Sequence, residues 1–310
     1  MRIVISGATG LVGTALRSAL LAENNDVARL ARPGSGQLAG DIRWDPASGA
    51  IDATVMEGAD AVVNLNGAGI GDSRWTAERK KVLRSSRVDS TRVLVDALAK
   101  LQRRPRVFIS ASAIGYYGSR GDEVLTEASA SGGDFIAALS HGWEAEALRA
   151  EAVGVRTVIV RFGIVLSAKG GALPRMLTPF KLGAGGRLGS GTQWMSWIEL
   201  DDVVGAIRAA IANDQLRGPV NVVAPNPVQN TEFTRILAKV LHRPAIFPAP
   251  AFALRLALGE MADALLLSSQ RVQPERLISA GFKFRFENLE SALRATLGVN
   301  SSALISQRSA

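Results

Sequence analysis

Short apolar runs alternate with longer amphipathic stretches through the first half of the chain. The short runs are rich in β-branched residues and are bounded by Gly, Asn or charged residues, which is typical of strands buried on both faces. They cover residues 2–6, 27–31, 61–65, 107–110 and 155–162. Segments long enough for helices separate them, at residues 12–22, 76–101 and 134–152. This alternation predicts an α/β fold with a Rossmann-like, doubly wound parallel sheet covered by helices on both faces.

The pattern changes after Phe162. Residues 170–196 contain seven glycines and two prolines, which predicts a long shaped loop with room for one helix. An apolar helix over residues 203–212 follows, with Asp201 or Asp202 as its expected N-cap, and residues 220–223 read as another strand. From Pro225 onward the chain is interrupted by prolines and has a mostly helical pattern.

These changes divide the chain into two predicted units and a tail. Residues 1–166 and 197–224 are expected to form a Rossmann-like, ligand-binding domain. Residues 167–196 and 225–298 form a smaller, mostly helical C-terminal lobe on the substrate side. Residues 299–310 are expected to be a flexible tail, as chain ends without packing partners usually are.

Composition narrows the possible chemistry. The 310 residues include no Cys and only two His, His141 and His242, in unrelated surroundings. Disulfides, thiolate zinc sites, iron–sulfur clusters and a cysteine nucleophile are therefore excluded, and no metal site is expected. The longest stretches without a charged residue have 14 residues and contain Gly or Pro, whereas a membrane-spanning helix needs roughly 18 apolar residues. We expect a cytoplasmic protein with no membrane partner.

The chain is basic, with 36 Lys and Arg against 28 Asp and Glu, a net charge of +8. Its densest basic run comprises Arg79, Lys80, Lys81, Arg84 and Arg87. No aromatic residue alternates with these charges, as it would in a site for single-stranded nucleic acid. We therefore expect no nucleic acid partner, and we interpret the run as a solvated helix face with one functional member. The oligomeric state stays open.

A glycine pattern directly after the first strand indicates a dinucleotide site. Residues 7–13 read GATGLVG and open the first helix. Gly7 permits the tight turn, Gly10 lets the backbone approach a pyrophosphate, and Gly13 lets helix and strand pack closely. The helix N-terminus then faces the anion. The residues expected at the cofactor here are Gly7, Thr9, Gly10, Leu11, Val12 and Gly13.

The end of the second strand favours NADP(H) over NAD(H). NAD-binding proteins place a carboxylate about 20 residues beyond the glycines to hold the ribose 2′-hydroxyl, but here the sequence reads VARLAR. A guanidinium binds a 2′-phosphate through charge-assisted hydrogen bonds. Arg32 lies at the carboxyl end of the strand and is the expected 2′-phosphate ligand, whereas Arg29 falls on the opposite face. A small-residue loop, NLNGAG at 64–69, would let the backbone approach the cofactor through Leu65, Asn66 and Gly67.

Several longer strings resemble one known group of proteins. They are GATGLVG, NLNGAG, ISASAIGYYG at 109–118, RWT at 74–76, SRVDST at 86–91, RFGIVLS at 161–167 and GSGTQWMSWIELDD at 189–202. Over roughly residues 1–298 the chain is similar to extended short-chain dehydrogenases/reductases. Within them it resembles an atypical epimerase-like branch, described as cell-division-inhibitor-like or NAD-dependent epimerase, with a small C-terminal domain of unassigned function. The Ser-Arg motif of that branch points to Arg87 as the member of the basic run that reaches the cofactor.

The resemblance also implies a catalytic pair that this chain lacks. Enzymes of the wider superfamily use Tyr-x-x-x-Lys, in which Tyr exchanges a proton and Lys assists it and holds the nicotinamide ribose. The corresponding positions fall near Ala138 and Gly142, and the two tyrosines, Tyr116 and Tyr117, have no Lys four residues on. Ordinary ketone reduction or 4-epimerisation is therefore in doubt, and so is any role tied to a His that the branch often has where this chain has Glu199.

The remaining candidates for chemistry come from the carboxyl end of the fifth predicted strand. Ser112 matches the catalytic serine of the superfamily, and Tyr116 and Tyr117 would lie over the nicotinamide, although loop packing explains all three equally well. For His141 a structural role is favoured. Trp194 and Trp197 could line a substrate pocket or pack the loop.

Two functions follow from this reading. The first is an NADP(H)-dependent, epimerase-like oxidoreductase without the Tyr-x-x-x-Lys pair, acting on a small polar molecule that resembles a nucleotide sugar. The alternative is a non-catalytic, NADP(H)-sensing regulatory protein. The missing pair favours the second, the Gly- and Trp-containing loop at 170–196 favours the first, and the fold supports both.

Overall fold

The computed structural model of the chain describes residues 1–32 and 41–299. The predicted tail therefore lies, apart from Val299, outside the described residues. In the described part of the chain, no helix combines the length and the apolar character needed to cross a membrane.

An eight-stranded sheet forms the centre of the molecule, in the order β12-β8-β6-β5-β1-β2-β3-β4. Its strands are β1 (Arg2–Ser6), β2 (Asp26–Ala31), β3 (Ile42–Asp45), β4 (Ala50–Ile51), β5 (Ala61–Asn64), β6 (Val107–Ala113), β8 (Arg156–Phe162) and β12 (Gly218–Val222). Every pair is parallel except β3 with β4. The order reverses direction at β1, between β2 and β5, which is where α/β sheets of this kind bind ligands. The predicted doubly wound α/β fold is confirmed.

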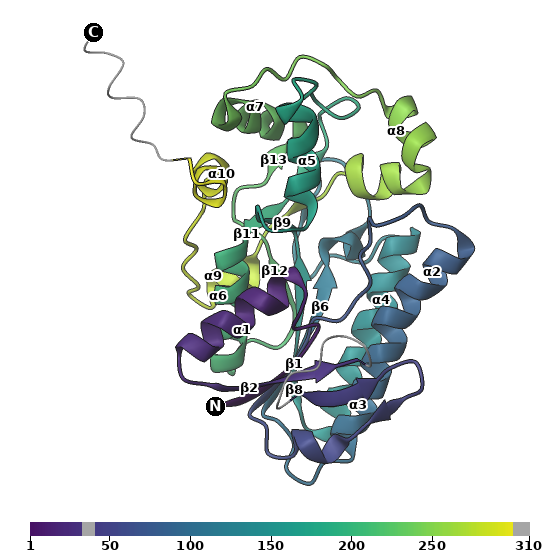
Figure 1. The fold of residues 1–310 in the computed structure, drawn as a ribbon, viewed down its shortest axis with the longest axis vertical. Helices are drawn as coiled ribbons and strands as arrows, with labels where there is room; N and C mark the ends of the chain where they lie inside the picture. The colour runs from purple at the N-terminus through teal and green to yellow at the C-terminus, as the bar shows by residue number, and fades with distance from the viewer. Residues whose placement is uncertain (33–40, 300–310) are drawn as a thin grey trace, which may run out of the picture.

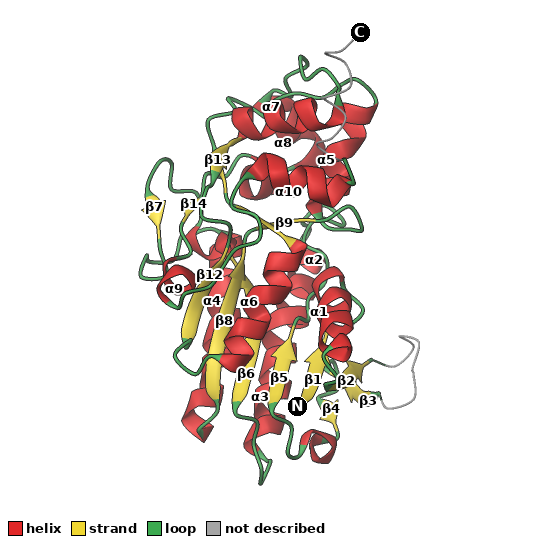
Figure 2. Ribbon diagram, turned by 90° about the vertical axis from the view of Figure 1, so that its left-hand side faces the viewer, coloured by secondary structure: helices red, strands yellow, loops and turns green. Residues whose placement is uncertain are grey.

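Helices cover both faces of the sheet, and the strands alternate between two cores (Figures 1 and 2). On one face lie α1 (Leu11–Ala22) and α6 (Leu200–Ala212), and on the other α3 (Ser90–Ala99) and α4 (Phe135–Leu148). Ile3 and Ile5 pack against the first pair, whereas Val4 between them packs against the second. This period of two is what strands buried on both faces require.

The predicted helix at 76–101 is divided into three parts. α2 (Ala77–Arg84) is followed by a π-helical turn, η2 (Ser85–Asp89), and then by α3. Thr76 caps α2 by accepting a hydrogen bond from the Arg79 amide at 3.2 Å. A π-helical turn changes the direction in which the side chains after it point. Such turns are frequent at functional sites. It lies here at Arg87.

The C-terminal lobe has a core of its own. α5 (Ala172–Lys181), α7 (Asn230–Leu241) and α10 (Leu289–Leu297) bury Leu173, Phe233, Leu237 and Leu293 with Trp197. Two small sheets accompany them, β9 (Ile164–Leu166) with β11 (Trp197–Glu199), and β10 (Trp194–Met195) with β13 (Val228–Gln229). α8 (Ala251–Leu258) lies beside this core, with none of its side chains buried (Figure 1). The loop predicted at 170–196 thus contains the one helix for which it had room.

Part of the stretch assigned to the lobe packs on the main sheet instead. Leu277 in α9 (Glu275–Ser279) is fully buried in the core beneath α1 and α6, and Phe282 and Phe284 pack against it. Just before them, β14 (Arg271–Val272) pairs with β7 (Val124–Leu125). The remaining elements are short turns: η1 (Ala53–Met56), η3 (Ile114–Tyr117), η4 (Arg149–Val153) and η5 (Ala262–Leu266).

The expected N-cap at Asp201 or Asp202 is wrong. α6 begins at Leu200, and the carboxylate of Glu199 caps it by accepting from the Asp201 amide at 2.5 Å. Both aspartates lie inside the first turn, where a negative charge suits the helix dipole. Asp202 accepts from the backbone amides of Arg285 and Phe286 at 2.7 and 3.0 Å, and so fastens the returning segment to the sheet domain.

Candidate functional site

The turn after β1 has the backbone geometry that the glycine pattern predicted. Gly7 has φ +69°, and a Cβ placed on it would lie 2.5 Å from the Leu65 carbonyl oxygen. A Cβ on Gly13 would lie 2.7 Å from the Ala8 Cα and closer still to the Gly7 carbonyl. Only glycine fits at these two positions, because both neighbours are backbone atoms that a side chain cannot push aside.

The N-terminus of α1 opens beside this turn. Gly10 is the N-cap and offers no capping side chain, and the first turn of the helix contains no acid. The amides of the first helical turn have no partner within the helix. Together with the helix dipole they form an anion-binding end of the kind that holds a pyrophosphate. Leu11 and Val12 lie in this turn, and Thr9 and Gly10 are exposed before it.

A hollow at the carboxyl end of β1 and β2 gathers several predicted cofactor residues. Gly7, Thr9, Arg32 and Asn66 line it. Its other lining residues are Ala8, Arg29, Leu30, Ala31 and Trp44. Arg29 was expected on the opposite face from Arg32, but both arginines line this hollow, because Arg32 lies just beyond the end of β2, where the strand alternation no longer holds. Trp44 belongs to β3, a short strand with charged neighbours that no apolar run marked. The hollow therefore places two arginines opposite the glycine turn.

Arg29 carries a carboxylate partner that the sequence analysis missed. Its Nε and Nη2 donate to the two oxygens of Asp41 at 2.7 and 2.5 Å, and the Asp41 side chain is almost fully buried. The hydrogen bond to Asp41 raises the pKa of Arg29 above its ordinary value. Asp41 does not line the hollow, and its charge is matched by the guanidinium it binds. No motif could point to Asp41, because it comes from outside β2.

Arg87 is half-buried against the loop that follows β5. Its Nη2 donates to the Ala68 carbonyl at 2.9 Å, its Nη1 to the Leu83 carbonyl at 3.3 Å, and its Cζ lies 5.4 Å from the Trp143 ring centroid. A Cβ on Gly67 would lie 3.1 Å from that Cζ. Burial, helped by the charge of Arg79, lowers the pKa of Arg87 to about 10. In the described part of the chain, Arg87 pairs with no carboxylate, so its half-buried positive charge beside the predicted cofactor loop is met only by carbonyl and hydroxyl oxygens.

A second cluster, the buried ion-pair network, lies at the carboxyl ends of β6 and β8. Arg161 donates to both oxygens of Glu144, at 2.8 and 2.7 Å, and Ser112 donates to the same carboxylate at 2.5 Å. Arg161 also donates to the Tyr117 hydroxyl at 2.9 Å, and Tyr117 donates to Asn221 at 2.7 Å. All five side chains are buried. Burial works against the charge of Arg161, but the carboxylate of Glu144 raises its pKa above the ordinary value.

This network separates the three catalytic candidates. Tyr117 is fully buried, and this burial raises its pKa to about 12 despite the nearby charge of Arg161. Ser112 is also buried, so neither hydroxyl is open to a ligand. Tyr116 is partly exposed: its ring lies over the Arg161 guanidinium and stacks near the exposed His141, with ring centroids 6.4 Å apart.

Sequence reasoning missed Glu144, Arg161 and Asn221. Arg161 stands among the apolar residues of β8, and a charge in a buried strand needs a partner. That signal was present within the string RFGIVLS. The partner of Arg161 could not be identified from the sequence, because Glu144 comes from a different element and only the packing of α4 on β8 brings the two side chains together.

The two tryptophans differ in their surroundings. Trp194 is partly exposed, donates from Nε1 to Asp122 at 2.7 Å, and lies 4.4 Å from the Arg271 guanidinium carbon. Trp197 is fully buried in the core of the lobe and donates to the Asn226 carbonyl at 3.0 Å. Of the two readings for Trp197, a pocket wall or packing, the structure shows packing.

The residues of the basic run also differ in exposure and in their partners. Lys80 pairs with Glu260 at 2.5 Å and lies 4.7 Å from the Phe135 ring centroid, so it links α2 to the segment after α8. Lys81 and Arg84 are exposed. Arg79, Lys80 and Arg87 are half-buried, and Arg87, in the π-helical turn, is the one that lies beside Gly67.

Comparisons with known proteins agree with this geometry. Residues 3–224 match the NAD dependent epimerase/dehydratase family, and residues 249–296 match a domain of unknown function, DUF1731. The chain is 40% identical over 297 residues to the epimerase family protein YfhF of Bacillus subtilis, covering 94% of this chain and 97% of that protein. It is 38% identical over 312 residues to an Arabidopsis thaliana protein named epimerase family protein SDR39U1 homolog, chloroplastic, covering 96% of this chain and 87% of that protein.

Two solved structures resemble this one over nearly the whole chain. A crystal structure of human epimerase family protein SDR39U1 (isoform 2) with NADPH superposes with a TM-score of 0.86 at 32% identity, covering 97% of this chain and 100% of that one. A nucleoside-diphosphate sugar epimerase from Corynebacterium glutamicum superposes with a TM-score of 0.81 at 35% identity, covering 99% of this chain and 60% of that one. The chain therefore belongs to the NAD dependent epimerase/dehydratase family, with an NAD(P)-binding Rossmann fold and a C-terminal domain of the DUF1731 type.

Proposed function

We propose that this protein binds NADP(H) and is an epimerase-like oxidoreductase of the extended short-chain dehydrogenase/reductase type, acting on a small polar molecule without a Tyr-x-x-x-Lys pair. The observation that carries the proposal is the hollow beside the glycine turn, lined by Arg29 and Arg32 together with Gly7, Thr9 and Asn66. The NADPH in the structure of the human relative supports the same cofactor.

The arginines favour the phosphorylated dinucleotide. Arg29 balances Asp41, so the carboxylate near this end of the site is already engaged. Arg32 also lines the hollow, where a guanidinium would bind a 2′-phosphate carrying two negative charges more strongly than a hydroxyl. Gly10 and the first turn of α1 would hold the pyrophosphate.

Arg87 would hold the part of the cofactor that passes Gly67. Keeping a guanidinium half-buried without a carboxylate is costly, and an anion or hydroxyl groups beside it offset that cost. The nicotinamide, when bound, would supply hydride exchange. The residues of this chain contribute binding, orientation and, at Tyr116, a partly exposed hydroxyl.

The non-catalytic, NADP(H)-sensing alternative rests on a specific observation. The hydroxyls of Ser112 and Tyr117 already donate hydrogen bonds to Glu144 and Asn221, and neither side chain is exposed. A sensor would bind NADPH and turn over no carbonyl compound. An oxidoreductase would oxidise NADPH on at least one member of a carbonyl panel, and would lose that activity in Tyr116→Phe.

Cofactor choice is tested by titrating NADPH and NADH against the wild type and Arg32→Ala. The variant is expected to weaken NADPH binding by about 1.5–3 kcal/mol and to leave NADH almost unchanged. Arg217→Ala is the matched control, because it removes an exposed arginine before β12 at the far edge of the sheet. Equal losses for both cofactors, or tighter binding of NADH by the wild type, would refute the assignment.

A further inference from the structure

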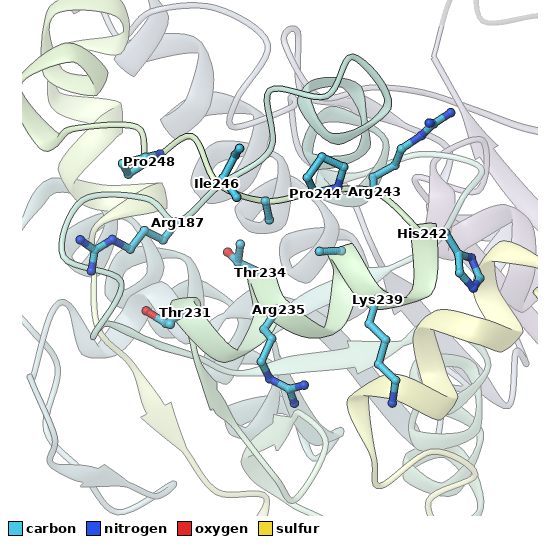
Figure 3. A pocket seen from close by; sticks show the side chains of 12 residues that line it. Arg187, Thr231, Thr234, Arg235, Lys239, His242, Arg243, Pro244, Ile246 and Pro248 are labelled. Carbon is cyan, nitrogen blue, oxygen red and sulfur yellow. The ribbon is translucent and has the colours of Figure 1, made fainter.

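A second hollow, of about 970 Å³, lies in the C-terminal lobe between α7 and the chain at residues 243–248 (Figure 3). It shares no lining residue with the cofactor hollow. Its apolar part includes Ala238, Ala245 and Ile246, and we call it, with its basic rim, the basic groove. The rim consists of Arg187, Arg235, Lys239 and Arg243.

The construction of α7 explains why the groove is open. One face of the helix is buried in the core of the lobe through Phe233, Leu237 and Val240. Ala238, in an adjoining row of the helix, lines the groove. Figure 3 shows Arg235 and Lys239 on α7 along its edge. Residues four apart on a helix are about 6 Å apart along its axis, so these two cations form a regularly spaced edge.

The charged residues that line the groove are all positive. No acidic residue lines it. Arg235 and Lys239 pair with Glu232 and Glu290 at 2.6 and 2.8 Å, but both cations are more than half exposed, so each pair is worth only about 0–1 kcal/mol. A partner's carboxylates can therefore replace them at little cost. Within the described residues, Arg243 forms no ion pair.

Apolar surface continues beyond the groove. Ile246 is 71% exposed and Phe247, next to it, is 58% exposed. These two adjacent residues extend the apolar surface of the hollow, and contiguous exposed apolar surface of this kind marks interaction sites. An apolar centre with a charged rim is the usual anatomy of a protein interface.

We propose that the basic groove docks an acidic amphipathic helix of a partner protein. The partner's apolar side chains would enter the hollow over Ala238 and Ile246, and carboxylates four residues apart would face Arg235 and Lys239. This spacing matches the edge of α7. A second copy of this chain fits the rim less well, because each copy carries a net charge of +8. Docking here is independent of the proposed cofactor, since the two hollows have separate walls.

The proposal is tested with a synthetic fluorescent helical peptide that has Leu on one face and Glu at flanking positions four apart. The full chain is expected to bind it, and Arg235→Gln with Lys239→Gln to weaken binding about tenfold, which is about 1.4 kcal/mol. Ala238→Glu, which adds a carboxylate to the hollow itself, should weaken it at least as much. Lys81→Gln with Arg84→Gln on α2 is the matched control, with the same loss of charge at exposed positions, and should bind like the wild type.

Three results would overturn the proposal. The groove variants and the α2 control could lose affinity equally, which would indicate general charge attraction. Polyglutamate of equal charge could bind as tightly as the peptide, so that the hollow contributes nothing. Vesicles containing anionic lipid could bind the chain and displace the peptide, which would assign the groove to a membrane surface. Thermal unfolding of each variant shows whether it is folded, and Ala238→Glu keeps the test decisive if the double variant is not.

Discussion

The Arg161 guanidinium carbon lies 3.5 Å from the centroid of the Tyr116 ring, while the same guanidinium forms a two-point ion pair with Glu144. One buried cation thus joins β8, α4 and the turn η3 that carries Tyr116. The partly exposed phenol of Tyr116 is therefore positioned by a pair that neither solvent nor salt reaches easily. Removing one member of the pair should affect folding and the position of Tyr116 together.

Glu144→Gln is expected to destabilise the protein strongly. It leaves Arg161 buried without a counter-charge, a change that typically costs about 3–5 kcal/mol. Urea unfolding measures the loss. Glu146→Gln is the control on the same helix, because Glu146 pairs with Arg92 and Arg149 nearer the surface, and it should cost about 1 kcal/mol or less. Equal losses in the two variants would contradict the role given to the buried pair.

Tyr117 should keep its proton to unusually high pH. Burial raises its pKa to about 12, against about 10 in the unfolded chain. Between pH 10 and 12 the unfolded state then loses this proton while the folded state keeps it, so the contribution of Tyr117 to stability falls as pH rises, by up to about 1.4 kcal/mol per pH unit. Below pH 10 the contribution is fully present.

Comparing the wild type with Tyr117→Phe isolates this effect from other groups that titrate in the same range. The difference in unfolding free energy should be constant between pH 7 and 9 and should shrink between pH 10 and 12. A tyrosinate absorbance titration of Tyr116→Phe, in which Tyr117 is the one remaining tyrosine, gives an independent check. An ordinary midpoint near 10 would show that the hydroxyl is not enclosed as described.

The fold could be predicted largely because its signals are local. Ile3, Val4 and Ile5 alternate between the two cores, and Gly7 and Gly13 mark backbone contacts within a single turn. The same reasoning failed where contacts between elements distant in the sequence determine the structure. Glu199 rather than an aspartate caps α6, and the Asp202 carboxylate instead accepts from backbone amides more than eighty residues later in the chain.

The residues of the candidate site that lie in sequence motifs could be predicted. Arg32 and the glycines follow from their place after strands, and the structure gathers Gly7, Thr9, Arg32 and Asn66 around one hollow. The pairing of Arg29 with Asp41 depends on tertiary packing, which no sequence spacing encodes. The family motif points to Arg87 as a cofactor residue, which stays a prediction, and its half-buried place beside Gly67 depends on a π-helical turn that the apolar pattern could not reveal.

Gly13→Ala should destabilise the protein and abolish tight cofactor binding. The new methyl group would meet the backbone of Gly7 and Ala8, so α1 must move away from β1, at a cost of about 1–3 kcal/mol. Thermal unfolding with and without NADPH measures both effects. Gly133→Ala, at a position with nothing within 4 Å of the added Cβ, is the matched control and should leave both unchanged. If the two variants unfold at the same temperature, the close approach of α1 to β1 is not as described.

Arg87 should contribute to the binding of both cofactors, unlike Arg32. It lies beside Gly67 and Trp143, away from the lining of the hollow that contains Arg32, so it cannot distinguish a 2′-phosphate from a hydroxyl. Arg87→Ala is therefore expected to weaken NADPH and NADH binding alike, by about 1.5–3 kcal/mol. Lys80→Ala removes a half-buried charge of the same run, paired with the exposed Glu260, and should change neither by more than about 1 kcal/mol. A larger effect from Lys80→Ala would mean that the helix face has been misread.

A lysine placed on the neighbouring helix should restore part of what Arg87→Ala removes. Gly142 is the position where the resemblance puts the missing lysine, and a Cβ there would lie 3.7 Å from Val88 Cγ2 and 3.9 Å from Arg84 Nη1, which is ordinary contact. Once Arg87 is shortened, a lysine from this position can reach the vacated space beside Trp143, so the double variant Arg87→Ala with Gly142→Lys should bind both cofactors more tightly than Arg87→Ala alone. Arg87→Ala with Gly142→Ala controls for the gain in helix propensity, about 1 kcal/mol in stability, and should recover no affinity. If the alanine restores binding as well as the lysine does, Arg87 acts by packing and not through its charge.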